Sequence, residues 1–167
     1  EVIEAHFLFA LKPKQIEVVV HPQSIVHSLV HFDDGSVLSQ LGLPDMRTAI
    51  SYALSYPERQ TSGVASLDLT KQRPLVFLPP NLEAFTCLGL AYNALKIGKN
   101  APTVLNAANE VSVEAFLNKQ IGFLDISKTI ESVLDAVPTT NLDTLASVVE
   151  NDQISRQVAK SVIESRA

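Results

Sequence analysis

The sequence predicts an α+β fold, in which a small β-hairpin sheet is followed by a C-terminal bundle of α-helices. Two β-rich runs, residues 25–32 and 37–42, flank an Asp-Asp-Gly-Ser link, and its glycine accepts the positive φ of a hairpin turn. From residue 81 onward, apolar residues recur every three or four positions, which is the period of an amphipathic helix. This change of period predicts the order of the two parts and no strands over residues 101–137.

Composition narrows the class of protein. The 167 residues are 46% hydrophobic and 19% charged, which is typical of a globular protein with a buried core. The net charge of −5, without a run of lysine or arginine, argues against a nucleic-acid partner. Apolar runs are too short to span a bilayer, so we expect no membrane partner. The single cysteine, Cys87, excludes an internal disulfide and favours a reducing compartment.

The chain before the hairpin is expected to form one helix and one short strand. Residues 1–11 have apolar side chains at helical spacing, and Glu1 and Glu4 share one face. By residue type alone, two such carboxylates indicate a solvated face. Pro13 ends the helix. The β-rich residues 16–20 are expected to pair with the hairpin.

Alternation along the first hairpin strand predicts two unlike faces. Val26, Val30 and Phe32 would share a core face. The opposite, mixed face would carry His27 and His31 together with Ile25 and Leu29. That mixed face suits a site or a subunit contact. The histidines are four residues apart, but this spacing suits a zinc pair on a helix rather than on a strand.

A helix is expected over residues 46–56, with Asp45 as its N-cap and Ile50 and Leu54 on its apolar face. Residues 57–80 have weak periodicity and are read as a long connection. The bundle helices follow. They are expected from residue 81 to the C-cap Gly98, along the stripe 104–115 to about Lys119, over 126–137 with Asp125 as cap, near 142–150, and over 152–165.

Four motifs carry a family resemblance: His21-Pro22-Gln23-Ser24, Asp34-Gly35-Ser36, residues 41–48 (LGLPDMRT) and residues 102–111 (PTVLNAANEV). In this order they resemble 1-deoxy-D-xylulose 5-phosphate reductoisomerase of the non-mevalonate isoprenoid pathway. The resemblance runs from residue 1 to about 163 and covers only the C-terminal part of the family's chain. The sequence is therefore expected to be a C-terminal fragment.

The resemblance implies an NADPH-dependent oxidoreductase that converts 1-deoxy-D-xylulose 5-phosphate to 2-C-methyl-D-erythritol 4-phosphate, with Mg²⁺ or Mn²⁺ held by three acidic residues. It implies that Glu1 is one metal ligand and also a catalytic and substrate-binding residue. It places Ser24 at the substrate, His27 among the catalytic residues and Met46 at the cofactor. For Ser24 and His27 an alternative remains open, namely that they are ordinary polar residues of a sheet without a role in the site.

The resemblance also implies a domain organisation, partners and a location. Residues 1–64 would be the C-terminal part of a catalytic domain and would include its dimerisation sheet. Residues 65–80 would connect this part to the helical domain, residues 81–167. The partners would be a sugar phosphate and a second copy of the chain, in bacterial cytoplasm or in a plastid.

The chain is expected to be inactive on its own. The sequence has no G-x-G-x-x-G or Walker pattern and no Gly-x-Ser-x-Gly elbow. The alternative function is a non-catalytic dimerisation or scaffold module.

Overall fold

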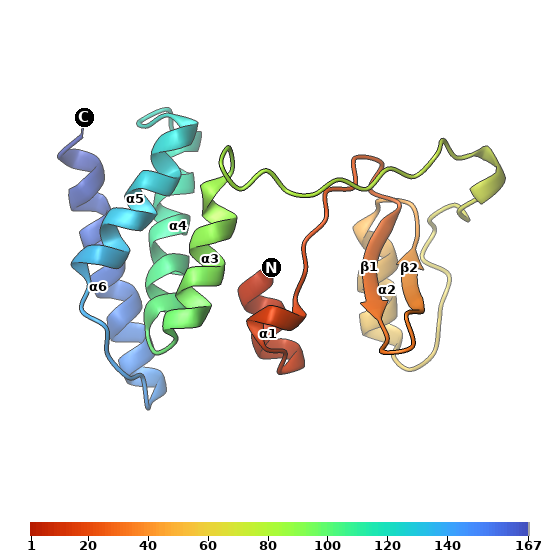
Figure 1. Ribbon diagram of the computed structural model, residues 1–167, viewed down its shortest axis with the longest axis horizontal. Helices are drawn as coiled ribbons and strands as arrows, with labels where there is room; N and C mark the ends of the chain where they lie inside the picture. Colours follow the sequence, from red (N-terminus) through yellow and green to blue (C-terminus); the bar gives the residue numbers. More distant parts are fainter. Residues whose placement is uncertain (167) are drawn as a thin grey trace. The chain divides into compact units, whose positions relative to one another are not determined.

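The computed structural model describes residues 1–166 and divides into two compact units. The helical unit joins residues 1–17 to the helices from residue 81 onward, and the hairpin unit comprises Val18–Pro80 (Figure 1). The predicted α+β fold class is confirmed. Within residues 1–166, no helix combines the length and apolar character that crossing a membrane requires.

The first 17 residues belong to the helical unit because they pack on its first long helix. The Tyr92 hydroxyl donates a hydrogen bond of 2.8 Å to the carbonyl of Ile16. The compact units thus have other boundaries than the expected division at residues 64 and 80, which remains a prediction about the domains of the whole protein.

The helical unit buries one apolar core. Val104 and Ala108 of α4, Ile130 and Val133 of α5, and Ala159 of α6 are all at most 2% exposed. These residues recur at helical spacing, so each helix turns one apolar stripe inward. The α-helices of this unit are α1 (Val2–Phe9), α3 (Thr86–Ile97), α4 (Ala101–Leu117), α5 (Phe123–Ala136) and α6 (Leu145–Glu164).

Asn100 joins the two loops at one end of the bundle. It is 1% exposed, its Nδ2 donates to the carbonyl of Pro138 at 3.0 Å, and its Oδ1 accepts from the backbone N–H of Thr140 at 3.0 Å. The backbone N–H of Asn100 also donates to the carbonyl of Thr140. Gly98, two residues earlier, ends α3 with φ 68°, as its position after the apolar stripe predicts.

Two expected helix boundaries were wrong. Helix α5 begins at Phe123, so Asp125 is its third residue and Gly122 is the N-cap. The Asp125 carboxylate accepts a hydrogen bond of 3.1 Å from the backbone N–H of Gly122. The two expected last helices are one helix, α6, since nothing between them breaks a helix. Asn151 and Ser155 are buried inside it, and the Ser155 hydroxyl donates to the carbonyl of Asn151.

The predicted hairpin and the helix after it are confirmed in the hairpin unit. Strands β1 (Val26–His31) and β2 (Val37–Leu41) are antiparallel, and helix α2 spans Met46–Ser55. The predicted cap of α2 is also confirmed, because Asp45 accepts the N–H of Arg47. All of residues 101–137 are described, and none of them is a strand.

The expected core face of β1 was wrong. Ile25 is buried at 5% exposure and Leu29 is half-buried, whereas Val30 is 54% and Phe32 46% exposed. Alternation placed Ile25 and Leu29 together on the mixed face, so the better-buried face is the one opposite to that expected. The pairing register also shifts between Val26 and Ser28.

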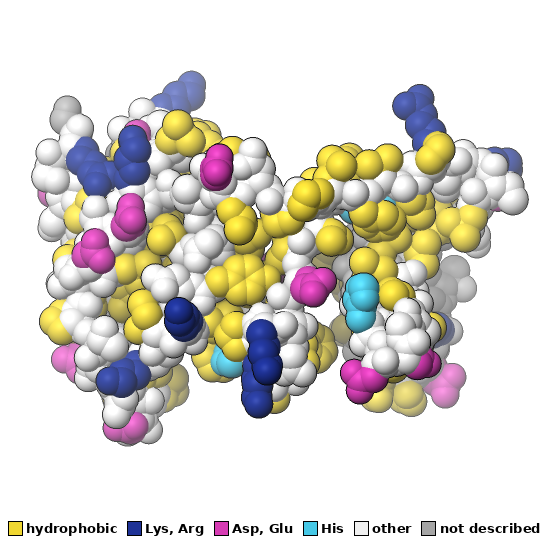
Figure 2. Space-filling view, in the orientation of Figure 1, with side chains coloured by type: hydrophobic (Ala, Val, Ile, Leu, Met, Phe, Trp, Pro, Cys, Tyr) yellow, Lys and Arg dark blue, Asp and Glu magenta, His cyan; other side chains and the backbone are white. Residues whose placement is uncertain are grey.

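The expected pairing of residues 16–20 with the hairpin was also wrong. Among the described residues, Val20 forms a bridge with Leu78 and not with the hairpin. On α2, Ile50 and Leu54 lie four residues apart on one face, as expected, and that face is exposed, at 52% and 85% for these two residues. Many hydrophobic side chains, yellow in Figure 2, accordingly lie at the surface.

Candidate functional site

The open end of the hairpin gathers three of the four candidate residues. Ile25, directly after Ser24, accepts a hydrogen bond of 3.0 Å from the backbone N–H of Gly42. His27 lies on β1 two residues after Ile25, and Met46 follows Gly42 by four residues. The hairpin thus brings Ser24, His27 and the start of α2 to the same end of the sheet.

Ser24 occupies an uncommon backbone conformation. Its φ is 51°, in the left-handed region that residues with a Cβ rarely adopt, and its side chain is exposed. Its N–H donates to the carbonyl of His21 at 3.0 Å, closing a turn around Pro22. The turn presents the hydroxyl of Ser24 to solvent, where it could bind a polar ligand.

The His27 ring is oriented by the backbone of the opposite strand. Its Nε2 lies 3.2 Å from the carbonyl of Gly42. Because a carbonyl only accepts, Nε2 is the donor in this bond. The exposed ring can therefore use Nδ1 toward a ligand.

Met46 is the first residue of α2, and its side chain is 70% exposed. The residues on either side hold this helix start in place. Arg47 donates from Nε and Nη2 to the carboxylate of Asp45, the shortest distance being 2.7 Å. This hydrogen bonding, together with the bond from the Arg47 backbone, lowers the pKa of Asp45 to about 2. Asp45 is therefore a fixed anion that caps α2 and does not exchange protons near neutral pH.

Glu1 lies in the helical unit, whereas the other three candidates belong to the hairpin unit. Its side chain is fully exposed and makes no capping bond at the start of α1. Its carboxylate is the oxygen donor that Mg²⁺ and Mn²⁺ prefer, but residues 1–166 contain no group of three metal-binding side chains. The described residues alone therefore do not make a complete metal site.

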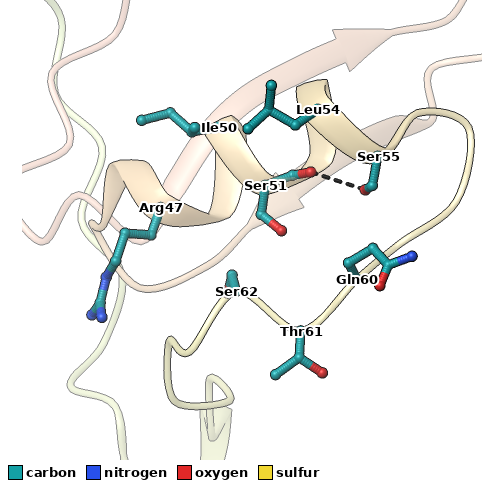
Figure 3. A pocket seen from close by; sticks show the side chains of 8 residues that line it. All are labelled: Arg47, Ile50, Ser51, Leu54, Ser55, Gln60, Thr61 and Ser62. Carbon is teal, nitrogen blue, oxygen red and sulfur yellow. Dashed lines mark hydrogen bonds between the residues drawn. The ribbon is translucent and has the colours of Figure 1, made fainter.

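A surface pocket lies between α2 and the following loop (Figure 3). Its Ser55 hydroxyl donates to the carbonyl of Ser51 at 2.9 Å, and Arg47 is already paired with Asp45. No carboxylate or histidine lines this pocket, so it offers no general acid or base. The lining residues are Arg47, Ile50, Ser51, Leu54, Ser55, Gln60, Thr61 and Ser62.

Sequence reasoning missed the contacts of His21 and Gln23. Both side chains hydrogen-bond to the backbone of residues 74–76. The motif His21-Pro22-Gln23-Ser24 was a signal that this turn matters. Nothing in sequence spacing, however, indicates which distant backbone groups it would meet.

Solved structures with high similarity to this fold include enzymes of the reductoisomerase class. A 1-deoxy-D-xylulose 5-phosphate reductoisomerase from Zymomonas mobilis, in complex with NADPH, is 44% identical with a TM-score of 0.91. A structure of a DOX-P reductoisomerase in complex with NADPH, fosmidomycin and magnesium is also 44% identical and has a TM-score of 0.90. The chain belongs to the 1-deoxy-D-xylulose 5-phosphate reductoisomerase family, because its residues 41–158 match the model of the DXP reductoisomerase C-terminal domain. The family expected from the motifs is confirmed.

Curated relatives agree with this assignment. The reductoisomerase of Vesicomyosocius okutanii is 57% identical over 98% of this chain and 43% of its own length. That of Xanthomonas oryzae is 54% identical over 100% of this chain and 42% of its own length. The two solved structures are likewise covered over 43% and 42% of their chains, and this chain over 98%. The chain thus spans less than half the length of the relatives it matches.

Proposed function

We propose that this chain is the C-terminal part of an enzyme that converts 1-deoxy-D-xylulose 5-phosphate to 2-C-methyl-D-erythritol 4-phosphate with NADPH, in non-mevalonate isoprenoid biosynthesis. The observation that carries the proposal is 57% identity to a reductoisomerase over 98% of the chain. Relatives with NADPH, magnesium and fosmidomycin in their solved structures support the cofactors and a small-molecule ligand.

The chain's own residues have separate roles in this proposal. Ser24 binds the substrate through its exposed hydroxyl, and Met46 packs against the nicotinamide side of the cofactor. His27 contacts the reacting substrate through Nδ1 while Nε2 is held by Gly42. Glu1 is one carboxylate ligand of a Mg²⁺ or Mn²⁺ ion that, when bound, stabilises negative charge on substrate oxygens.

The function is tested with two preparations. The whole protein that contains this chain should oxidise NADPH only when 1-deoxy-D-xylulose 5-phosphate and Mg²⁺ or Mn²⁺ are present. The 167-residue chain alone should show no turnover, since it has no dinucleotide-binding motif and one proposed metal ligand. Substrate-dependent turnover by the short chain, free of any longer protein, would contradict the second expectation.

For His27, two amide substitutions separate a catalytic from a structural role. Glutamine places its amide nitrogen near Nε2 and can keep the bond to Gly42, whereas asparagine places its amide near Nδ1. If Nδ1 contacts the substrate, His27→Gln in the whole enzyme should lower kcat by about 10²-fold or more. His27→Asn should lower kcat by a smaller factor. The reverse order would show that His27 only supports Gly42.

We also propose a homodimer through the hairpin sheet. Leu38 of β2 is 66% exposed and Val30 of β1 is 54% exposed, which is unusual for a sheet unless another surface covers it. Leu38→Asp should shift the whole protein from dimer to monomer in light scattering. Leu145→Asp, at a 79% exposed position of α6, is the matched control and should leave the dimer intact. A dimer that survives Leu38→Asp would exclude this face.

The alternative function is a non-catalytic dimerisation or scaffold module. The exposed sheet supports it, and it would apply to the chain in isolation. A dimer without activity from the short chain, together with full activity from the whole protein, would show that both descriptions hold for different lengths of the same protein.

A further inference from the structure

The turn that carries Ser24 is hydrogen-bonded to residues 74–78, which lie far along the chain. Val20 and Leu78 exchange two backbone hydrogen bonds of 2.8 and 2.9 Å. One residue after Val20, His21 Nδ1 lies 2.7 Å from the carbonyl of Val76, 55 residues away in sequence. These contacts bring the two segments together within the hairpin unit.

The side-chain amide of Gln23 bonds to the same distant segment through both its nitrogen and its oxygen. Its Nε2 donates to the carbonyl of Pro74 at 3.1 Å, and its Oε1 accepts the N–H of Val76 at 3.2 Å. Alternate residues 74, 76 and 78 thus turn their backbone groups toward the turn, as a strand does toward a neighbouring strand. We call residues 20–23 and 74–78, joined by these bonds, the clasp.

The imidazole of His21 is fixed in orientation. The carbonyl of Val76 can only accept, so Nδ1 carries the hydrogen. The ring also stacks on Phe77, with centroids 4.6 Å apart and planes at 12°. Nε2 is buried and has no hydrogen-bond partner among the described residues. The ring therefore contributes one directed bond and one stacking contact to the clasp.

We propose that His21 and Gln23 are positioning residues that hold Ser24 in its substrate-binding conformation. A left-handed backbone at a residue with a Cβ persists only where its surroundings over-determine it, and the clasp ends one residue before Ser24. This inference rests on the proposed function, because it needs Ser24 to bind the substrate. The orientation of the Ser24 hydroxyl then depends on the bonds from its turn to residues 74–78, in addition to the bond within the turn from the Ser24 N–H to the carbonyl of His21.

The test is steady-state kinetics of the whole enzyme. His21→Ala should raise the KM for the sugar phosphate by about tenfold and change kcat by less than about twofold, since it disturbs a binding group and not the chemistry. His21→Asn should recover most of the lost affinity, because its amide nitrogen can replace the Nδ1 donor. In a Ser24→Ala background, His21→Ala should have no further effect on KM.

Amide hydrogen exchange provides a readout that does not depend on turnover. Gln23→Ala should accelerate exchange at the Val76 N–H, which has lost its acceptor, while the unfolding midpoint shows whether the fold is kept. An unchanged exchange rate at the Val76 N–H would show that Gln23 does not hold residues 74–78, and the proposal would be wrong.

The kinetic outcomes separate this inference from the proposed function. If Ser24→Ala raises KM and His21→Ala does not, the positioning role is wrong and the function stands. If Ser24→Ala leaves KM unchanged, the positioning role is equally wrong. If the wild-type enzyme does not turn over, the proposed function fails and the positioning role fails with it, while the exchange of Val76 still decides whether the clasp exists.

Discussion

Glu1→Gln in the whole reductoisomerase is expected to lower turnover by at least about 100-fold and to weaken Mn²⁺ binding. The substitution keeps the size of the side chain and removes the charge that a hard divalent cation needs. Loss of a group that only supports a metal ligand typically costs 10–100-fold, so loss of a direct ligand should cost more. Turnover and Mn²⁺ affinity by titration calorimetry are the two measurements.

Glu4→Gln is the matched variant for this experiment. Glu4 lies one helical turn from Glu1, and its side chain is 73% exposed. If Glu1→Gln retains wild-type turnover and Mn²⁺ affinity while Glu4→Gln loses both, the ligand is Glu4. A loss confined to Glu1→Gln supports the proposed assignment.

Ile130→Ala is expected to lower the free energy of unfolding of the bundle by about 2–5 kcal/mol. Ile130 is 1% exposed, and its side chain packs in the core shared by α4, α5 and α6. A loss of this size is a large share of the roughly 5–15 kcal/mol that stabilises a typical domain. Urea unfolding of the whole protein, followed by helical circular dichroism, measures it.

Leu124→Ala is the control on the same helix. Leu124 is 63% exposed, so its truncation should change the free energy of unfolding by less than about 0.5 kcal/mol. Equal losses for Leu124 and Ile130 would mean that burial on α5 differs from the packing described.

Local patterns predicted the elements of this fold better than their packing. The period of 3.6 located the helical segments, because residues such as Val104 and Ala108 must share a face once a helix forms. It nevertheless divided α6 into two helices. The core face of β1 was not predictable in the same way. Both faces of β1 carry apolar residues, and which face is covered depends on tertiary packing, which leaves Val30 and Phe32 exposed.

The candidate site shows the same limit. Asp45 could be recognised as a cap because its partner lies two residues away, at Arg47. The bonds of His21 and Gln23 to the backbone of residues 74–76 join parts of the chain that no local pattern connects. Such contacts become visible only when the chain is folded.

The buried side chain of Asn100 has a consequence for how the bundle opens. Because it bonds both Pro138 and Thr140, the loop before α4 and the loop after α5 cannot separate from each other without breaking the same set of hydrogen bonds. Local unfolding proceeds in cooperative units, and shared bonds of this kind define which segments belong to one unit. The loop before α4 and the loop after α5 should therefore open together, as parts of one cooperative unit.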